Sequence, residues 1–277
     1  MKFVFAADIH GNMSQYQKIF DYLKQKNIPL LVLGGDLTPK NQELRNPLAQ
    51  KEFLHNSLFP LIQEYLGRVL IIMGNDDYRR NLKFLEDNQS VIGYKLIYSP
   101  CLIDGFYFAG YSYVPYTPFK WKDWERRDLS SDEETNLRYD VATKGFIDYD
   151  KPYDIMSDFK SHSIEQDLTD LLKNVPAEKL IFVTHAPPAD TAADFTKDNE
   201  GNLRHVGSYA VYKIIREKQP LISLHGHIHD TVQNSGIFPE KIGRTICCAV
   251  SNDHIGEHPY IVEVDTSHGI MVERKNL

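Results

Sequence analysis

The residues of this chain that could do chemistry stand at the ends of apolar runs. Five short apolar runs each lead directly into carboxylate, amide or imidazole side chains. In chain order these groups are Asp8 and His10; Asp36; Asn75, Asp76 and Asp77; His185; and His227 and His229. Carboxylates and imidazoles together are typical ligands of borderline divalent ions such as Mn, Fe, Zn and Ni. The set therefore indicates metal-dependent chemistry.

The spacing within these groups fits ligands that share an ion. Asp8 and His10 are two residues apart, so on a regular strand they would share a face, and a bend could bring both onto one ion. His227 and His229 have the same spacing. Two ions about 3.5–4 Å apart can clamp a phosphoryl group. Such a pair needs one carboxylate that bridges both ions, and Asp36 is the natural candidate.

The apolar runs are the strands that we expect to position these groups, at residues 3–7, 30–33, 69–73, 180–184 and 221–224. Helical patterns lie at 14–26, 50–65, 163–173 and 208–218. Ser14 and Ser163 are expected N-caps, and Gln166 could close a capping box. This alternation predicts an α/β fold. Parallel strands would place the five polar groups together at one edge of the sheet, where ligands bind in such folds.

The rest of the chain predicts a single domain, 1–277, with an insertion or lid at 111–162. Residues 94–110 and 245–272 contain short strand candidates in close succession, which suggests hairpins. Segment 111–162 is rich in aromatic residues, including Tyr113, Tyr116, Phe119 and Trp121. These rings could pack a small subdomain or stack on a nucleoside or aryl group. Both alternatives remain open for different rings.

Composition excludes several classes of protein. The chain has 277 residues and a formal net charge of -7, which argues against stable nucleic-acid binding and against a nuclease. No apolar run is long enough to span a membrane and no signal peptide fits, so a cytoplasmic location is expected. The sequence does not indicate an oligomeric state. Cys101, Cys247 and Cys248 show no metal or disulfide pattern, and Cys247 and Cys248, in an apolar stretch, are expected to be buried thiols.

The order of the motifs resembles the calcineurin-like metallophosphoesterases. Asp-Ile-His at 8–10, Gly-Gly-Asp at 34–36, Gly-Asn-Asp at 74–76, His185 and Gly-His-Ile-His at 226–229 follow the family pattern over residues 3–230. The resemblance implies a four-layer α/β/β/α sandwich with metals at its edge. It implies that a hydroxide bridging the two metals attacks phosphorus. It also implies the ligand sets: Asp8, His10 and His229 for the first metal, Asn75, His185 and His227 for the second, and Asp36 between them.

One position departs from the family pattern. The histidine that usually follows the asparagine ligand, and that serves many members as proton donor, is Asp76 here. An ordinary aspartate is ionised near pH 7 and donates no proton. This favours phosphodiesters or activated leaving groups. Asp76 itself could act in catalysis or have a structural or helix-capping role, and Asp77 could contact His10 from behind and orient its ring.

Other polar residues carry weaker expectations. Asn12 could hydrogen-bond a substrate phosphate or form an Asx turn before the helix. Arg79 and Arg80 are expected in the first turn of a helix, where cations oppose the helix dipole, and this favours a phosphate-facing role. His205 precedes an expected helix start and could line an anion pocket, or lie in a plain loop. His254 and His258 are expected to be surface loop residues, and His225 a buried partner within its strand.

These observations predict a dinuclear metal-dependent phosphoesterase. We expect two divalent ions, Mn first and otherwise Fe, Zn or Ni, with Asp36, Asn75 and Asp76 in the catalytic centre. The expected partner is a small phosphodiester or a nucleotide-like substrate. The alternatives are a phosphomonoesterase, a protein serine/threonine phosphatase, or a non-catalytic scaffold with the same fold. A scaffold could lose metal ligands freely, yet none is missing from this sequence.

Overall fold

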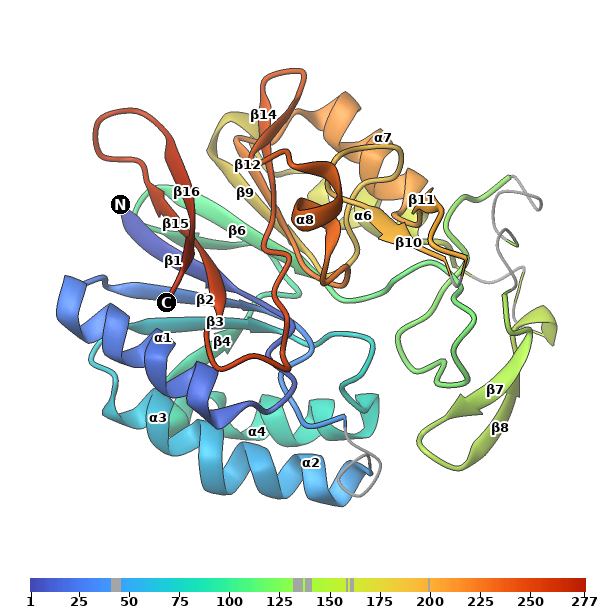
Figure 1. Cartoon of the computed structure of the whole chain (residues 1–277), viewed down its shortest axis with the longest axis horizontal. Helices are drawn as coiled ribbons and strands as arrows, with labels where there is room; N and C mark the ends of the chain where they lie inside the picture. The colour runs from blue at the N-terminus through green and yellow to red at the C-terminus, as the bar shows by residue number, and fades with distance from the viewer. Residues whose placement is uncertain (41–45, 132–136, 138–140, 158, 160–161, 199) are drawn as a thin grey trace.

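The structure is a computed structural model that describes residues 1–40, 46–131, 137, 141–157, 159, 162–198 and 200–277. Two six-stranded sheets face each other, and helices cover their outer faces (Figure 1). None of the helices in these described ranges is both long enough and apolar enough to cross a membrane.

The first sheet contains both ends of the chain. Its strand order is β16-β15-β1-β2-β3-β4. β1 to β4 run parallel, while β15 is antiparallel to β1 and β16 is antiparallel to β15. The strands are β1 (Lys2–Ala6), β2 (Leu30–Gly34), β3 (Arg68–Ile72), β4 (Tyr94–Leu96), β15 (Tyr260–Asp265) and β16 (Met271–Asn276).

The second sheet has the order β13-β14-β12-β9-β6-β5, with four parallel central strands and an antiparallel strand at each edge. These strands are β5 (Cys101–Ile103), β6 (Phe106–Tyr111), β9 (Leu180–Thr184), β12 (Ile222–His225), β13 (Glu240–Ile242) and β14 (Thr245–Ala249). Two small hairpins stand apart from the sheets, β7 (Lys144–Ile147) with β8 (Lys151–Asp154), and β10 (Phe195–Lys197) with β11 (Leu203–His205).

The helices begin close to the predicted positions, with two differences. Their bounds are α1 (Met13–Lys26), α2 (Pro47–Phe53), a π-helical turn (Leu54–Leu58), α3 (Phe59–Glu64), α4 (Leu82–Ile92), α6 (Ile164–Leu172), α7 (Tyr209–Lys218) and α8 (Thr231–Ser235), with 3-10 turns at Arg79–Asn81, Ile155–Ser157 and Ala177–Lys179. Asn12, not Ser14, caps α1, because its side chain accepts from the N–H of Gln15. The helix predicted from residue 50 begins three residues earlier, where Asn46 caps α2. Ser163 and Gln166 form the predicted capping box of α6.

Hydrophobic clusters fill the spaces between the two sheets and between each sheet and its helices. Alternate residues of each strand point to opposite faces of its sheet. Leu33 and Ile71 pack outward against α1 and α3, and Phe5 packs inward against the second sheet. Phe182 packs on the outer side of the second sheet with Leu168 of α6, in the cluster that also contains α7. The predicted α/β/β/α sandwich is therefore confirmed. Cys247 and Cys248 are buried and free, as predicted, and Cys101 is buried and free as well.

Part of segment 111–162 lies outside the described residues, and the described part is tied to both halves of the sandwich. The indole N–H of Trp124 donates to the carbonyl of Asp77 (2.7 Å), and Asp123 accepts from the N–H of Arg79 (3.1 Å). On the other half, Asp128 accepts from the N–H of Tyr209 at the start of α7 (2.6 Å). Residues 123–128 therefore form a fixed bridge across one end of the two sheets.

Candidate metal centre

The five polar groups meet where the carboxyl ends of the two sheets face each other. β1, β2 and β3 of the first sheet end next to Asp8, Asp36 and Asn75. β9 and β12 of the second sheet end next to His185 and His227. The sequence placed all five groups at the edge of one sheet, and this was wrong, because the chain leaves the first sheet after β4. The two sheets instead bring their parallel strand ends together.

One group of ligand atoms is tightly packed. Asp8, His10, Asp36 and His229 each offer one donor atom, and these four atoms all lie within 4.8 Å of one another. Nε2 of His10 is 3.2 Å from Nε2 of His229 and 3.5 Å from Oδ2 of Asp36. These are the residues that the resemblance assigns to the first metal.

A second group adjoins the first through Asp36. Nε2 of His185 is 3.0 Å from Oδ1 of Asn75 and 3.4 Å from Oδ2 of Asp36. The ring centroids of His185 and His227 are 5.2 Å apart. Oδ2 of Asp36 thus lies within 3.5 Å of both His10 and His185, between the two groups of candidate ligands.

The backbone at this site adopts conformations that ordinary strands avoid. Asp8, His10, Asp36 and His227 have φ values of 57°, 47°, 51° and 71°, in the left-handed region that non-glycine residues rarely use. Hydrogen bonds between the loops hold these turns: the N–H of His10 donates to the carbonyl of Asp36 (2.9 Å), and that of His227 donates to the Asp8 carboxylate (2.9 Å). Such strain costs about 1–3 kcal/mol per residue and is concentrated at functional sites.

A glycine permits the close approach of the loops. Gly35 has a φ of 99°, and a Cβ on it would meet Nδ1 of His185 at 2.7 Å and the backbone of Gly74 at 2.8 Å. Any side chain there would separate His185 from Asp36.

Burial and the neighbouring charges set the pKa values, and so the protonation states, of the candidate ligands. Burial lowers the pKa of His227 to about 3 and of His229 to about 4, and it also holds the pKa of His10 well below its ordinary value. These rings are neutral near pH 7, as metal ligands must be. Burial raises the pKa of Asp8 to about 7. Burial opposes ionisation of Asp36 too, but His185 and His10 hold its pKa well below the ordinary value.

The donor set fits divalent ions. The carbonyl of Gly34 can only accept, so the Nδ1 of His185 carries the proton of their 3.0 Å hydrogen bond and Nε2 faces Asp36 and Asn75. Burial lowers the pKa of His185, but the nearby Asp36 outweighs it and raises this pKa to about 9. A cation between these groups would replace the second proton of His185 and offset the repulsion between Asp8 and Asp36.

Asp76 and Asp77 have different roles from each other. The N–H of Asp76 donates to Oδ1 of Asp36 (2.8 Å), and the Asp76 carboxylate lies 3.9 Å from Nδ1 of His10. The Asp77 carboxylate instead accepts from the N–H groups of Leu37 (3.0 Å) and Gly74 (2.9 Å). Asp77 thus joins the loops after β2 and β3, and it does not contact His10 as the sequence had suggested.

The four residues predicted to contact substrate are bonded to other parts of the protein. Asn12 caps α1 and donates to the carbonyl of His254 (2.8 Å). Arg79 donates to the hydroxyl of Tyr113 (2.9 Å), and Arg80 to the carbonyl of Asp148 (2.8 Å). Nδ1 of His205 pairs with the buried Asp194 carboxylate (2.7 Å). The structure brings none of these four side chains to the cavity beside the metal ligands, because each is held by another element.

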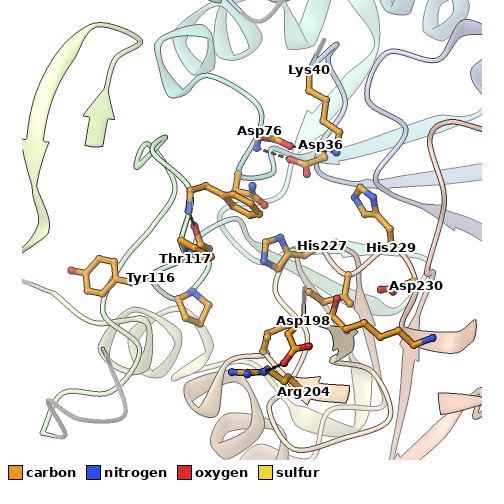
Figure 2. A pocket seen from close by; sticks show the side chains of 18 of the residues that line it. Asp36, Lys40, Asp76, Tyr116, Thr117, Asp198, Arg204, His227, His229 and Asp230 are labelled. Carbon is orange, nitrogen blue, oxygen red and sulfur yellow. Dashed lines mark hydrogen bonds and ion pairs between the residues drawn. The ribbon is translucent and has the colours of Figure 1, made fainter. Parts of the chain in front are cut away.

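A cavity of about 790 Å³ opens from the candidate metal ligands. Figure 2 shows Asp36, Asp76 and Lys40 on one side of it, Tyr116 and Thr117 on a second, and Asp198 and Arg204 on a third, with His227 between them. Phe119 also lines the cavity, and 55% of its surface is exposed. Tyr113 and Trp121 do not line it: Tyr113 packs on Trp124, and Trp121 on Phe146.

Sequence reasoning missed two residues at this site. Nζ of Lys40, in the loop after β2, lies 3.2 Å from Nε2 of His10 and 3.8 Å from the Asp76 carboxylate. His254, expected on a free surface loop, lies against His10 with ring centroids 4.6 Å apart. The same strand-end rule could have found His254, because residues 251–254 are polar and follow the apolar strand β14.

Comparison with known proteins gives a family match and solved structures with a similar fold. A family model described as calcineurin-like phosphoesterase matches residues 1–231. A comparison with curated proteins gives no match. Among solved structures, TT1561 of Thermus thermophilus has a TM-score of 0.60 at 16% identity, covering 99% of this chain and 98% of that chain. A dimetal phosphatase from Danio rerio has a TM-score of 0.55 at 14% identity, covering 100% and 96%. At such low identity these two structures show a shared fold.

Proposed function

The chain belongs to the calcineurin-like phosphoesterase family and is a metal-dependent phosphoester hydrolase, and we propose that its substrate is a small phosphodiester with an aromatic or nucleotide-like group. The observation that carries this proposal is the cavity, which runs from the metal ligands to the rings of Tyr116 and Phe119. Cavities of about 300–1,000 Å³ suit small organic ligands. A phosphoester bound at the metal ligands would extend its organic group toward these rings.

The residues at the metal end support phosphoester hydrolysis. Asp8, His10 and His229 would hold one ion and Asn75, His185 and His227 the other, with Asp36 between them. Two divalent ions bound here would polarise the phosphoryl group and activate water for its attack. We propose Mn as the native ion, with Fe, Zn or Ni as alternatives.

The protein's own side chains complete the environment of the phosphoryl group. Lys40 extends into the cavity beside Asp76 and places a positive charge near the position of phosphoryl oxygens. The N–H of Asp76 fixes one oxygen of Asp36, so the shared carboxylate keeps its orientation. Asp76 replaces the family's usual histidine and is a poor proton donor, which favours diesters with good leaving groups over alkyl monoesters.

The far end of the cavity supports an aromatic leaving group or nucleoside. Tyr116 is half-buried and Phe119 exposed, and both belong to the wall formed by residues 115–119. Across the cavity lie Lys197 and the Arg204–Asp198 ion pair of the β10–β11 hairpin (2.7 Å). A ring held at this end would meet aromatic carbon on one side and hydrogen-bonding groups on the other. A small substrate of this kind does not require an extended basic surface, which is consistent with the net charge of -7.

An activity panel tests the proposal. Protein purified without chelator and supplied with Mn should hydrolyse bis(p-nitrophenyl) phosphate faster than p-nitrophenyl phosphate, and Asp36→Asn should abolish both activities. Hydrolysis of the monoester alone would instead favour a phosphomonoesterase. Hydrolysis of neither compound nor of nucleotide diesters would refute the proposed substrate class.

Variants of the wall test the aromatic end. Stacking is worth about 1–3 kcal/mol per base, so Phe119→Ala should raise the KM for an aromatic diester roughly 5- to 150-fold. Phe146→Ala is the matched control, because Phe146 is an exposed phenylalanine of the same segment that does not line the cavity. Equal KM values in the two variants would refute the assigned orientation of the substrate.

A further inference from the structure

We propose that His254 is a further ligand of the first metal, the ion that Asp8, His10 and His229 would hold. The loop that contains His254, residues 250–259, connects β14 of the second sheet to β15 of the first (Figure 1). It therefore crosses the edge at which the two sheets bring their metal ligands together. This inference rests on the proposed metal-dependent function and adds a residue to its centre.

The rings of three histidines converge. The centroid of His254 is 4.6 Å from that of His10, with the planes at 62°, and 5.1 Å from that of His229, with the planes at 72°. One ring nitrogen from each of His10, His229 and His254 can be chosen so that all three lie within 4.8 Å of one another. Donors on one ion with bonds of about 2.1 Å lie at most about 4.2 Å apart. The three rings thus need to shift by about half an ångström relative to one another. Asp8 and Asp36 form a separate group with His10 and His229, so His254 would also have to move toward these carboxylates to share their ion.

A nitrogen of His254 has no other use in the structure. Its Nδ1 is buried, and among the described residues it has no hydrogen-bond partner. Buried polar atoms of folded proteins are nearly always paired, so an unpaired imidazole nitrogen beside two metal ligands needs an explanation. Coordination of a metal through Nδ1 would satisfy it.

The loop is attached to both metal-binding motifs. The hydroxyl of Ser251 donates to the carbonyl of His229 (2.9 Å), and the side chain of Asn252 donates to the carbonyl of Asp8 (3.2 Å). These contacts join the residues just before His254 to one ligand from each sheet. The position of His254 is thus fixed by the metal site itself rather than by the surface.

The start of α1 holds the loop from the other side. The side chain of Asn12 donates to the carbonyl groups of His254 (2.8 Å) and Gly256 (3.0 Å), and that of Gln15 donates to the carbonyl groups of Asp253 and Gly256 (both 2.7 Å). Asn12 follows the Asp8-Ile9-His10 motif by two residues. We infer that Asn12 positions His254 rather than a substrate phosphate.

The test measures metal binding as well as activity. Full-length protein is freed of metal with a chelator and titrated with Co²⁺, and heat and visible absorption are recorded. The unaltered protein should bind two ions per chain. His254→Ala should weaken one site about tenfold or more, leave the other within about twofold, and change the visible spectrum of bound Co²⁺. His258→Ala is the control, because His258 lies in the same loop but is exposed.

A second variant tests the positioning of the loop. Asn12→Ser keeps an N-cap acceptor for α1 but removes the amide that holds His254, so it should weaken the same site as His254→Ala. Two sites of unchanged affinity and an unchanged Co²⁺ spectrum in His254→Ala would overturn the proposal, even if the protein hydrolyses phosphodiesters. Weakening of one site in a protein that hydrolyses no phosphoester would support the ligand and remove the proposed function instead.

Discussion

A buried ion pair behind the cavity gives the sharpest prediction about the wall that contains Tyr116. Nζ of Lys122 lies 2.7 Å from a carboxylate oxygen of Glu125 and 2.9 Å from the carbonyl of Thr117. The side chains of the pair are 0% and 2% exposed. Glu125 also accepts from the N–H of Thr117 (3.1 Å), and Thr117 lines the cavity. The pair therefore holds the wall in place.

Replacement of Lys122 by methionine keeps most of the length of the side chain and removes the charge partner of Glu125, whose buried carboxyl retains only its hydrogen bonds from Thr117. Breaking a buried pair in this way costs about 3–5 kcal/mol of unfolding free energy. A protein of this size loses roughly 2–4 °C in melting temperature per kcal/mol, so the loss is about 6–20 °C. Because the carbonyl of Thr117 loses its hydrogen bond from Lys122, the wall is held less firmly, and the KM for a phosphodiester should rise more than kcat falls.

Urea denaturation and initial-rate kinetics provide the assay. Lys120→Met is the control, because Lys120 is exposed in the same segment. The double variant Lys122→Met, Glu125→Gln removes both charges and should recover at least about 1–2 kcal/mol of the loss. A single variant that costs less than about 1 kcal/mol, or a double variant no more stable than the single, would refute this reasoning.

Three further predictions follow from the site and its frame. Asp76→His restores a proton donor beside Asn75 and should raise the ratio of monoester to diester hydrolysis; an unchanged ratio would count against a role of Asp76 in substrate preference. Removal of bound metal with a chelator should lower the melting temperature, because ions at about 100 times their Kd stabilise by about 2.7 kcal/mol per site; equal melting curves would contradict an ordered metal site. Ser163→Ala removes the N-cap of α6 and should cost about 1 kcal/mol in urea denaturation, whereas Ser157→Ala, outside any capping box, should cost little.

The sequence alone predicted the candidate metal ligands that the structure brings together, for a physical reason. A buried strand must be apolar, so the first polar residues after it stand out, and parallel strands bring these residues to one end of the fold. Asp8, Asp36 and His185 could be found in this way without coordinates. The capping box at Ser163 was equally local, because both of its residues lie within four positions.

Only the tertiary structure decided what surrounds those ligands. The division of the strand ends between two sheets depends on where the chain leaves the first sheet, and no local pattern records this. The placement of His254 depends on a loop that spans both sheets and on Asn12, 242 residues away in sequence. Side chains that contact each other across such separations follow from packing of the whole fold. The candidate ligands could therefore be predicted from the sequence, whereas their neighbours could not.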